Sequence, residues 1–176
     1  MLKVKAGDLD KMGQLFDRYN RALYGYLFHS TGQRVESEDL VQTVFYRMLK
    51  YRQTFTESGE FRAWMYQLAR NALIDSAKKS SRTFYHADIS ITSDLHEKDE
   101  SLEQNLFENE NAELLQIALN KLPDEPRELL ILSKFQELPY REIAEILGTS
   151  EGNIKVKIHR AIGELRKLFL KENGRI

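Results

Sequence analysis

The feature that most constrains the fold is a tight corner between two amphipathic stretches in residues 138–169, LPYREIAEILGTSEGNIKVKIHRAIGELRKLF. Pro139 suits the first position of a helix, and Gly148 suits the left-handed conformation that ends one. Ser150 follows as a candidate N-cap of a second helix. The small Ala144 lets the two helices approach closely, and the glycine turn fixes their crossing. This combination indicates a helix-turn-helix, a motif whose second helix lies in the major groove of DNA.

The second helix of this motif is basic. Seven Lys or Arg residues stand against two Glu between Asn153 and Ile176. Apolar residues at spacings of three and four define its inner face, so the side chains between them face outward. The outward set is Lys155, Val156, His159, Arg160 and Gly163. A solvated surface helix would show the same charge, but the adjoining glycine corner favours a helix that binds phosphate and reads base edges.

The formal net charge of -1 conceals a strong division of charge along the chain. Residues 1–86 hold 14 basic and 9 acidic residues, residues 87–113 hold 1 and 9, and residues 114–176 hold 11 and 9. We therefore expect an N-terminal helical domain over 1–86 and a C-terminal helical domain over 108–176. A flexible acidic linker over 87–107 is expected to join them.

Helical periodicity runs through both expected domains. Apolar stripes predict helices over 9–31, 37–53, 61–82, 108–122 and 124–135, ahead of the helix-turn-helix. Ser37 is the expected N-cap of the second of these helices. No stretch alternates apolar and polar residues as a strand would. The expected fold is all-α: two small helical domains, the C-terminal one a four-helix domain.

Composition excludes several classes of protein. A hydrophobic content of 41% is ordinary for a soluble globular chain. No apolar run approaches the roughly 20 residues that span a bilayer, and the N-terminus lacks a signal-peptide core, so we expect a cytoplasmic protein with no membrane insertion. The chain has no cysteine, and its four histidines are scattered. We therefore expect no metal site, and the sequence shows no paired carboxylates, catalytic triad or glycine-rich phosphate loop, so neither a catalytic residue nor a cofactor is expected.

The predicted helix over 61–82 mixes aromatic and basic residues. Trp64 lies in its apolar stripe, and Arg62, Arg70, Lys78 and Lys79 are placed on the outside. Single-stranded nucleic acid is bound by this mixture, because bases stack on rings while cations hold the backbone. A lone Trp in a helical stripe is also a common core residue, so periodicity alone leaves both interpretations open.

Three stretches, in order, resemble one family. SEDLVQTVFYRML is similar to the polymerase-binding helix of bacterial sigma factors, and FRAWMYQLARNALIDSAKK to their promoter-melting and minus-10 helix. LPYREIAEILGTSEGNIKVKIHRAIGELRK resembles their minus-35 helix-turn-helix. The small size and short linker resemble the extracytoplasmic-function (ECF) subgroup. The resemblance covers nearly the whole chain except the linker.

The resemblance implies partners and a division of roles. Core RNA polymerase, through its beta-prime clamp helices and beta flap, and promoter DNA would be partners, and the family makes an anti-sigma factor a further candidate. The polymerase-facing residues would be Asp39, Gln42, Thr43 and Arg47. Thr43 departs from the acidic residue commonly found at its position, so one charged contact is missing or replaced.

The same resemblance assigns the residues that read the minus-10 element. The loop from Phe55 to Glu60, with Trp64 and Asn71, would capture a flipped base, which needs an apolar wall and an amide for its edge. Lys78 and Lys79 would hold nearby backbone.

The minus-35 element would be read by the basic helix. Its positions Lys155, Val156, His159 and Arg160 match the family's DNA-facing positions and agree with the outward face derived above. Arg160 suits a bidentate contact to guanine, whereas Lys155 and Lys157 suit phosphate. The function implied is that of an ECF-type sigma factor without a chemical step of its own. The alternative is a stand-alone helix-turn-helix regulator that binds an operator without polymerase.

Overall fold

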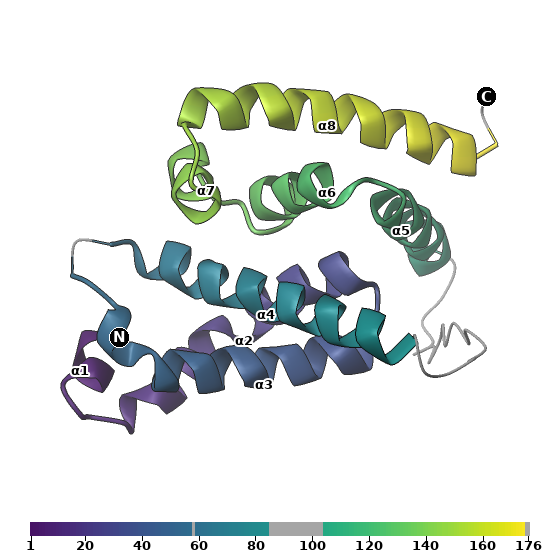
Figure 1. Ribbon diagram of the computed structural model, residues 1–176. Coiled ribbons are helices and arrows are strands. Elements are labelled where there is room, and N and C mark those ends of the chain that lie inside the picture. The colour runs from purple at the N-terminus through teal and green to yellow at the C-terminus, as the bar shows by residue number, and fades with distance from the viewer. Residues whose placement is uncertain (58, 85–103, 175–176) are drawn as a thin grey trace.

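The structure is a computed structural model that describes residues 1–57, 59–84 and 104–174 (Figure 1). Every regular element among these residues is helical, so the all-α expectation is confirmed. The elements are α1 (Leu2–Lys5), α2 (Lys11–Thr31), α3 (Arg34–Lys50), the 3-10 turn η1 (Arg52–Thr54), α4 (Phe61–Phe84), α5 (Gln104–Asn120), α6 (Asp124–Leu130), the π-helical turn η2 (Ile131–Phe135), α7 (Tyr140–Leu147) and α8 (Glu151–Glu172).

Helices α2, α3 and α4 pack side by side and form the lower layer in Figure 1. The predicted apolar stripe of α3 is buried between its neighbours, with Val44 and Met48 fully inaccessible to solvent. On α2, Leu23 and Leu27 are fully buried, and Gly32 ends the helix in the left-handed conformation with φ 70°. Helix α4, the predicted minus-10 helix, packs against α3 within this layer and against α7 of the other layer.

Helices α5 to α8 form the upper layer, and α7 and α8 make the predicted helix-turn-helix. Gly148 ends α7 with φ 64° and ψ 40°, and the Ser150 hydroxyl accepts a hydrogen bond from the Asn153 amide at 3.3 Å. Ile143 from α7 and Ile154 from α8 are fully buried. The glycine stop and the serine cap, both read from the sequence, thus set the corner as expected.

Several element boundaries differ from the sequence-based expectation. The predicted N-cap role of Ser37 is wrong, because α3 begins at Arg34 and Ser37 lies fully buried inside it. The Ser37 hydroxyl instead donates to the Gln33 carbonyl at 2.5 Å, a bond that a serine one turn into a helix makes readily. Helix α1 was not predicted. Residues 87–103 of the expected acidic linker lie outside the described residues. Helix α5 begins at Gln104 and so includes residues 104–107, which were expected to belong to the linker. The domain boundaries stay a prediction.

The two layers share one apolar core. Helix α6, the turn η2 and helix α7 lie over α2 and α4 (Figure 1), and η2 and α7 contribute buried side chains to the same cluster as the lower helices. From the upper layer these include Ile131, Leu132, Leu138 and Ile143. The sequence predicted two tethered domains but not this packing of one on the other.

Candidate nucleic-acid interface

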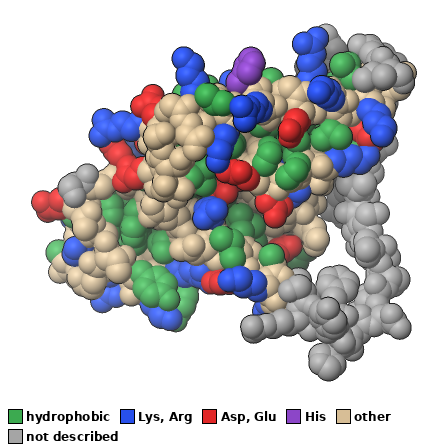
Figure 2. Space-filling model, turned by 45° about the horizontal axis from the view of Figure 1, so that its top comes forward, with side chains coloured by type: hydrophobic (Ala, Val, Ile, Leu, Met, Phe, Trp, Pro, Cys, Tyr) green, Lys and Arg blue, Asp and Glu red, His purple; other side chains and the backbone are tan. Residues whose placement is uncertain are grey.

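The outward face of α8 is exposed, as its periodicity predicted. Lys155, Val156, His159 and Arg160 are all exposed, and Val156 retains 49% of its accessible surface. Lys and Arg side chains stand along the edge of the molecule that α8 forms (Figure 2). A rigid helix with alternating cationic and apolar side chains can approach phosphates and base edges together.

Lys157 lies differently from its neighbours on α8. Its ammonium group forms an ion pair with Glu125 of α6 at 2.5 Å, and its side chain is 35% exposed. A DNA phosphate would have to displace the Glu125 carboxylate before Lys157 could contact that phosphate. Gly163 lies open on the same helix, because a Cβ built there meets nothing within 4 Å.

The residues predicted to read the minus-10 element divide into two groups. Asn71, Lys78 and Lys79 are exposed along α4, whereas Phe55 is only 6% exposed. The Phe55 ring meets Trp64 edge to face at 5.4 Å between centroids. Phe55 therefore packs against the Trp64 ring and does not itself offer an open stacking surface.

Trp64 is half-buried at the start of α4. Its indole N–H donates to the Thr54 hydroxyl at 3.2 Å, which fixes the ring against the η1 turn. Lys5 of α1 donates to the Phe55 carbonyl at 2.6 Å and holds the same loop from the other side. Contacts from α1 were absent from the sequence-based prediction, since a four-residue helix leaves no periodic signal.

A hollow of about 580 Å³ lies between the C-terminal end of α3 and α4. Asn71 and Lys78 line it, together with Tyr51 and Thr54, which sequence reasoning missed. The lining thus combines an aromatic ring, an amide, a hydroxyl and an ammonium group with the ion pair of Arg47 and Asp75. Tyr51 follows α3 directly and is 40% exposed. In the sequence, its aromatic side chain next to this helix was the only sign that it could contribute to a binding surface.

The residues predicted to bind polymerase also fall into two environments. Asp39 and Gln42 are exposed on α3, and Thr43 is half-buried beside them. Arg47 is instead bound to Asp75 of α4 at 2.9 Å, with 21% of its side chain exposed, and it lines the hollow. The structure therefore keeps Asp39 and Gln42 on an open surface and engages Arg47 within the N-terminal layer.

Burial shifts the pKa values of Tyr26 and His29, which lie away from these surfaces. Burial, and next the adjacent carboxylate of Glu128, raise the pKa of Tyr26 well above its usual value. Burial also lowers the pKa of His29, and the hydrogen bond of His29 to Gln116 partly opposes this shift.

In the described part of the chain no three His, Cys, Asp or Glu side chains gather as metal ligands would. No helix there is long and apolar enough to span a bilayer.

Comparison of the sequence with models of known protein families gives two matches. A sigma-70 region 2 model matches residues 15–83, which include α3 and α4, and a sigma-70 region 4 model matches residues 112–165, which include the helix-turn-helix. The ECF RNA polymerase sigma factor SigW of Bacillus subtilis is 30% identical over 94% of this chain and 92% of its own length. The chain belongs to the ECF sigma factors.

Other relatives agree with this membership. RNA polymerase sigma factor YlaC of Bacillus subtilis is 32% identical over 92% of this chain and 94% of its own length. ECF RNA polymerase sigma factor BldN of Streptomyces coelicolor is 34% identical over 95% of this chain, but this chain spans 63% of the length of BldN.

Solved structures share the fold of this sigma factor. The sigma factor RpoE from Bartonella quintana, solved in complex with the anti-sigma factor NepR, aligns with a TM-score of 0.72 at 24% identity over 89% of this chain and 94% of RpoE. CnrH, solved in complex with the cytosolic domain of CnrY, aligns with a TM-score of 0.70 at 21% identity over 95% of this chain and 92% of CnrH. At these identities the likeness concerns the fold alone.

Proposed function

We propose that this ECF sigma factor binds core RNA polymerase in the cytoplasm and directs it to promoters by reading a minus-10 and a minus-35 element. The observation that carries the proposal is the presence of regions 2 and 4 on one chain, with exposed basic residues on α4 at Lys78 and Lys79 and on α8 at Lys155 and Arg160. The sigma factor performs no chemical step itself. It supplies recognition, and it stabilises strand opening by trapping bases on the N-terminal domain.

For the minus-35 element, α8 enters the major groove. Arg160 donates a bidentate pair of hydrogen bonds to guanine, and Val156 makes apolar contact with a thymine methyl. His159 faces the same groove. Lys155 contacts phosphate, and Lys157 does so only after exchanging Glu125 for the DNA backbone.

For the minus-10 element, we assign a flipped base to the surface formed by Trp64 and the neighbouring hollow. Asn71 offers an amide to the base edge, and Tyr51 offers a ring in the same lining. Lys78 and Lys79 lie further along α4, where they would hold the backbone of the displaced strand. Phe55 contributes by positioning Trp64.

For polymerase, we assign the exposed face of α3 to the beta-prime clamp helices and region 4 to the beta flap. Asp39, Gln42 and the 64% exposed ring of Tyr46 form this α3 face, with Thr43 at its edge. Arg47 supports it indirectly by joining α3 to α4. An anti-sigma factor is a further candidate partner, because RpoE was solved bound to one.

The test is in vitro transcription with core polymerase on a library of promoters. We expect initiation only when both proteins are present, from templates that share an upstream and a downstream element. A stand-alone regulator would instead bind one operator tightly without polymerase, and failure of the purified chain to associate with core polymerase would refute the proposal.

A further inference from the structure

Helix α1 is anchored to the N-terminal layer although it has only four residues. Val4 is fully buried in the apolar core, and Met1 packs against the same core. Gly7 follows the helix with φ 109°, a conformation that residues with a side chain rarely adopt. The Asp8 amide donates to the Lys3 carbonyl at 3.0 Å, so the chain turns directly after α1. These contacts fix the position of the α1 backbone.

Two reciprocal hydrogen bonds join α1 to the segment that precedes α4. The Lys5 ammonium group donates to the Phe55 carbonyl at 2.6 Å, and the Gln53 side-chain amide donates to the Lys5 carbonyl at 3.2 Å. The backbone of Phe55 is extended, with φ -69° and ψ 129°, so its carbonyl leaves the 3-10 pattern of η1 and accepts from Lys5 instead. A hydrogen bond donated by an ammonium group is stronger than one between neutral groups. We call these two bonds the α1 clamp.

The α1 clamp holds both chain neighbours of Thr54. The Thr54 hydroxyl donates to the Tyr51 carbonyl at 2.8 Å and accepts a hydrogen bond from the Trp64 indole N–H at 3.2 Å. Tyr51 and Thr54 line the hollow beside α4. The Phe55 ring packs edge to face against Trp64. The position of the Trp64 ring relative to the hollow therefore depends on residues 53–55, and these residues are held by α1.

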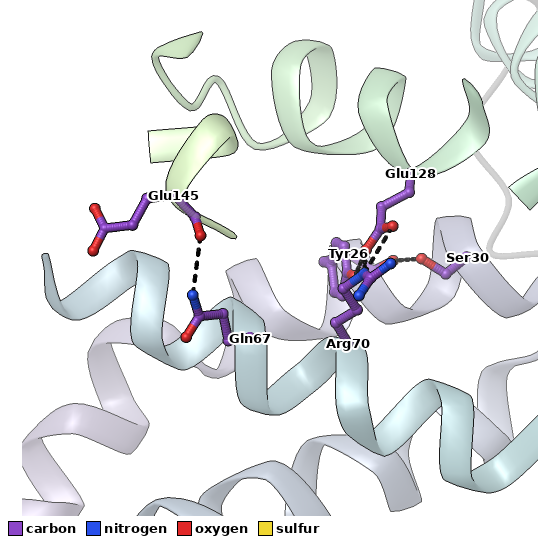
Figure 3. A network of polar contacts seen from close by, with 6 residues as sticks. All are labelled: Tyr26, Ser30, Gln67, Arg70, Glu128 and Glu145. Atoms are coloured by element: carbon purple, nitrogen blue, oxygen red, sulfur yellow. Dashed lines mark hydrogen bonds and ion pairs between the residues drawn. The ribbon is translucent and has the colours of Figure 1, made fainter. Parts of the chain in front are cut away.

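The rest of α4 is held by contacts that do not involve α1. Arg70 donates to both carboxylate oxygens of Glu128 on α6 at 3.0 and 3.1 Å, and the Gln67 amide donates to the Glu145 carbonyl of α7 at 3.1 Å (Figure 3). Helix α4 also packs along α3. Loss of the α1 clamp is therefore expected to displace the η1 segment rather than α4 itself, and so to change the cover of the indole ring.

Lys5 differs from the cations assigned to the DNA backbone. It is half-buried and its ammonium group binds a main-chain carbonyl, whereas Lys78 and Lys79 are exposed along α4. A cation that contacts phosphate strengthens binding to every promoter sequence alike. A cation that positions a base-binding surface instead changes which base is preferred. The two roles therefore predict different results for the same substitution.

We propose that Lys5 is a positioning residue for the minus-10 surface: through the α1 clamp it holds residues 53–55 so that Trp64 lies beside the hollow, and it thereby sets the preference for the captured base. The proposal rests on the proposed function, because it concerns the same surface. Lys5 acts through Phe55 and Thr54 and does not itself touch the DNA. It lies ahead of residues 15–83, which the sigma-70 region 2 model matches.

The fluorescence of Trp64 tests the α1 clamp without polymerase or DNA, because Trp64 is the only tryptophan of the chain. Lys5→Met keeps the apolar stem but cannot donate. We expect it to raise the acrylamide quenching constant of Trp64 roughly twofold, since losing a local hydrogen bond increases local opening. Lys5→Arg still donates and should keep the original constant. Lys3→Met, at an exposed position of the same helix, is the matched control. An unchanged constant in folded Lys5→Met would overturn the proposal.

Base selection by the polymerase holoenzyme tests the consequence for promoter recognition. Templates carry each of the four bases in turn at every position of the downstream element, and transcript yields give the preference for the best base. Lys5→Met should reduce this preference roughly fivefold at one position, which is part of the worth of a charge-assisted hydrogen bond. Lys5→Arg and Lys3→Met should retain it. Undiminished preference in Lys5→Met, or equal loss in Lys5→Arg and Lys5→Met, would contradict the positioning role.

Salt dependence separates positioning from a direct phosphate contact. The slope of the logarithm of promoter affinity against the logarithm of salt concentration counts the phosphate contacts of the holoenzyme. We expect Lys5→Met to leave this slope unchanged. A slope smaller in magnitude by about 1 would show that Lys5 binds phosphate, and the positioning role would be refuted.

Failure of this proposal can be distinguished from failure of the proposed function. Circular dichroism melting shows whether each variant is folded. If Lys5→Met does not fold, Gln53→Met takes its place, because it removes the other bond of the α1 clamp from an exposed position. If the unaltered chain directs polymerase to no template, the proposed function fails and this proposal with it. If the unaltered chain is active and the clamp variants keep its quenching constant and base preference, only this proposal fails.

Discussion

Two buried tyrosines offer a matched test of how the polar contacts between the two layers contribute to stability. Tyr26→Phe and Tyr66→Phe each delete one phenolic oxygen. The two rings pack against each other with 5.2 Å between their centroids. The oxygen of Tyr26 donates to the carboxylate of Glu128, whereas that of Tyr66 contacts the neutral amide of Gln136. Neither substitution leaves a cavity of consequence, so the difference between them isolates the charge of the acceptor.

The expected loss in the free energy of unfolding depends on whether the hydrogen-bond acceptor is charged. A hydrogen bond to a charged group is worth about 1.5–3 kcal/mol, and one between neutral groups about 0.5–1.5 kcal/mol. Arg70 still binds Glu128 in the Tyr26→Phe variant, which places the expected loss near the lower end, at about 1.5 kcal/mol. For Tyr66→Phe we expect about 1 kcal/mol or less.

The assay is urea unfolding of the full chain, followed by circular dichroism, with the free energy of unfolding obtained by linear extrapolation. Tyr46→Phe is the control, because Tyr46 is 64% exposed and its loss of a hydroxyl should change stability by less than about 0.5 kcal/mol. A Tyr66→Phe variant that loses as much stability as Tyr26→Phe would refute the argument from acceptor charge.

Three further outcomes are expected. Arg160→Ala should weaken transcription from the cognate promoter by about 1–3 kcal/mol and relax selection at one upstream base, and equal loss on every template would mean that Arg160 contacts phosphate alone. Gly163→Ala should raise the free energy of unfolding by up to about 1 kcal/mol, because its Cβ meets open space; if DNA binding falls instead, the glycine serves close approach to the groove. His29 has a lowered pKa in the folded chain, so its contribution to stability is present above the unfolded value of about 6.5 and is lost as pH falls below it. His29→Gln should flatten that loss in urea titrations at different pH.

Local signals predicted the helices and the helix-turn-helix well. The left-handed stop at Gly148 and the cap at Ser150 act within one turn of themselves, so they can be read without knowing the rest of the fold. The burial of Val44 and Met48 likewise follows from spacing alone. These features depend on neighbours that are near in sequence.

The contacts between the layers could not be read in the same way. Tyr26 and Glu128 are separated by 102 positions, and Arg70 and Glu128 by 58. A glutamate that pairs with a distant arginine looks like any solvated glutamate in the sequence. The family resemblance also implied an open base-binding role for Phe55, because a single aromatic residue in a loop gives no sign that its ring packs against Phe61 and Trp64.

The shared core has a consequence for exchanging parts between relatives. Regions 2 and 4 look like separable modules in sequence, but the α7 that carries Glu142 belongs to one and the α4 that carries Arg62 to the other. A hybrid built by transplanting region 4 alone would set unselected side chains against α4. Designers of hybrid sigma factors should therefore carry both halves of that contact across together.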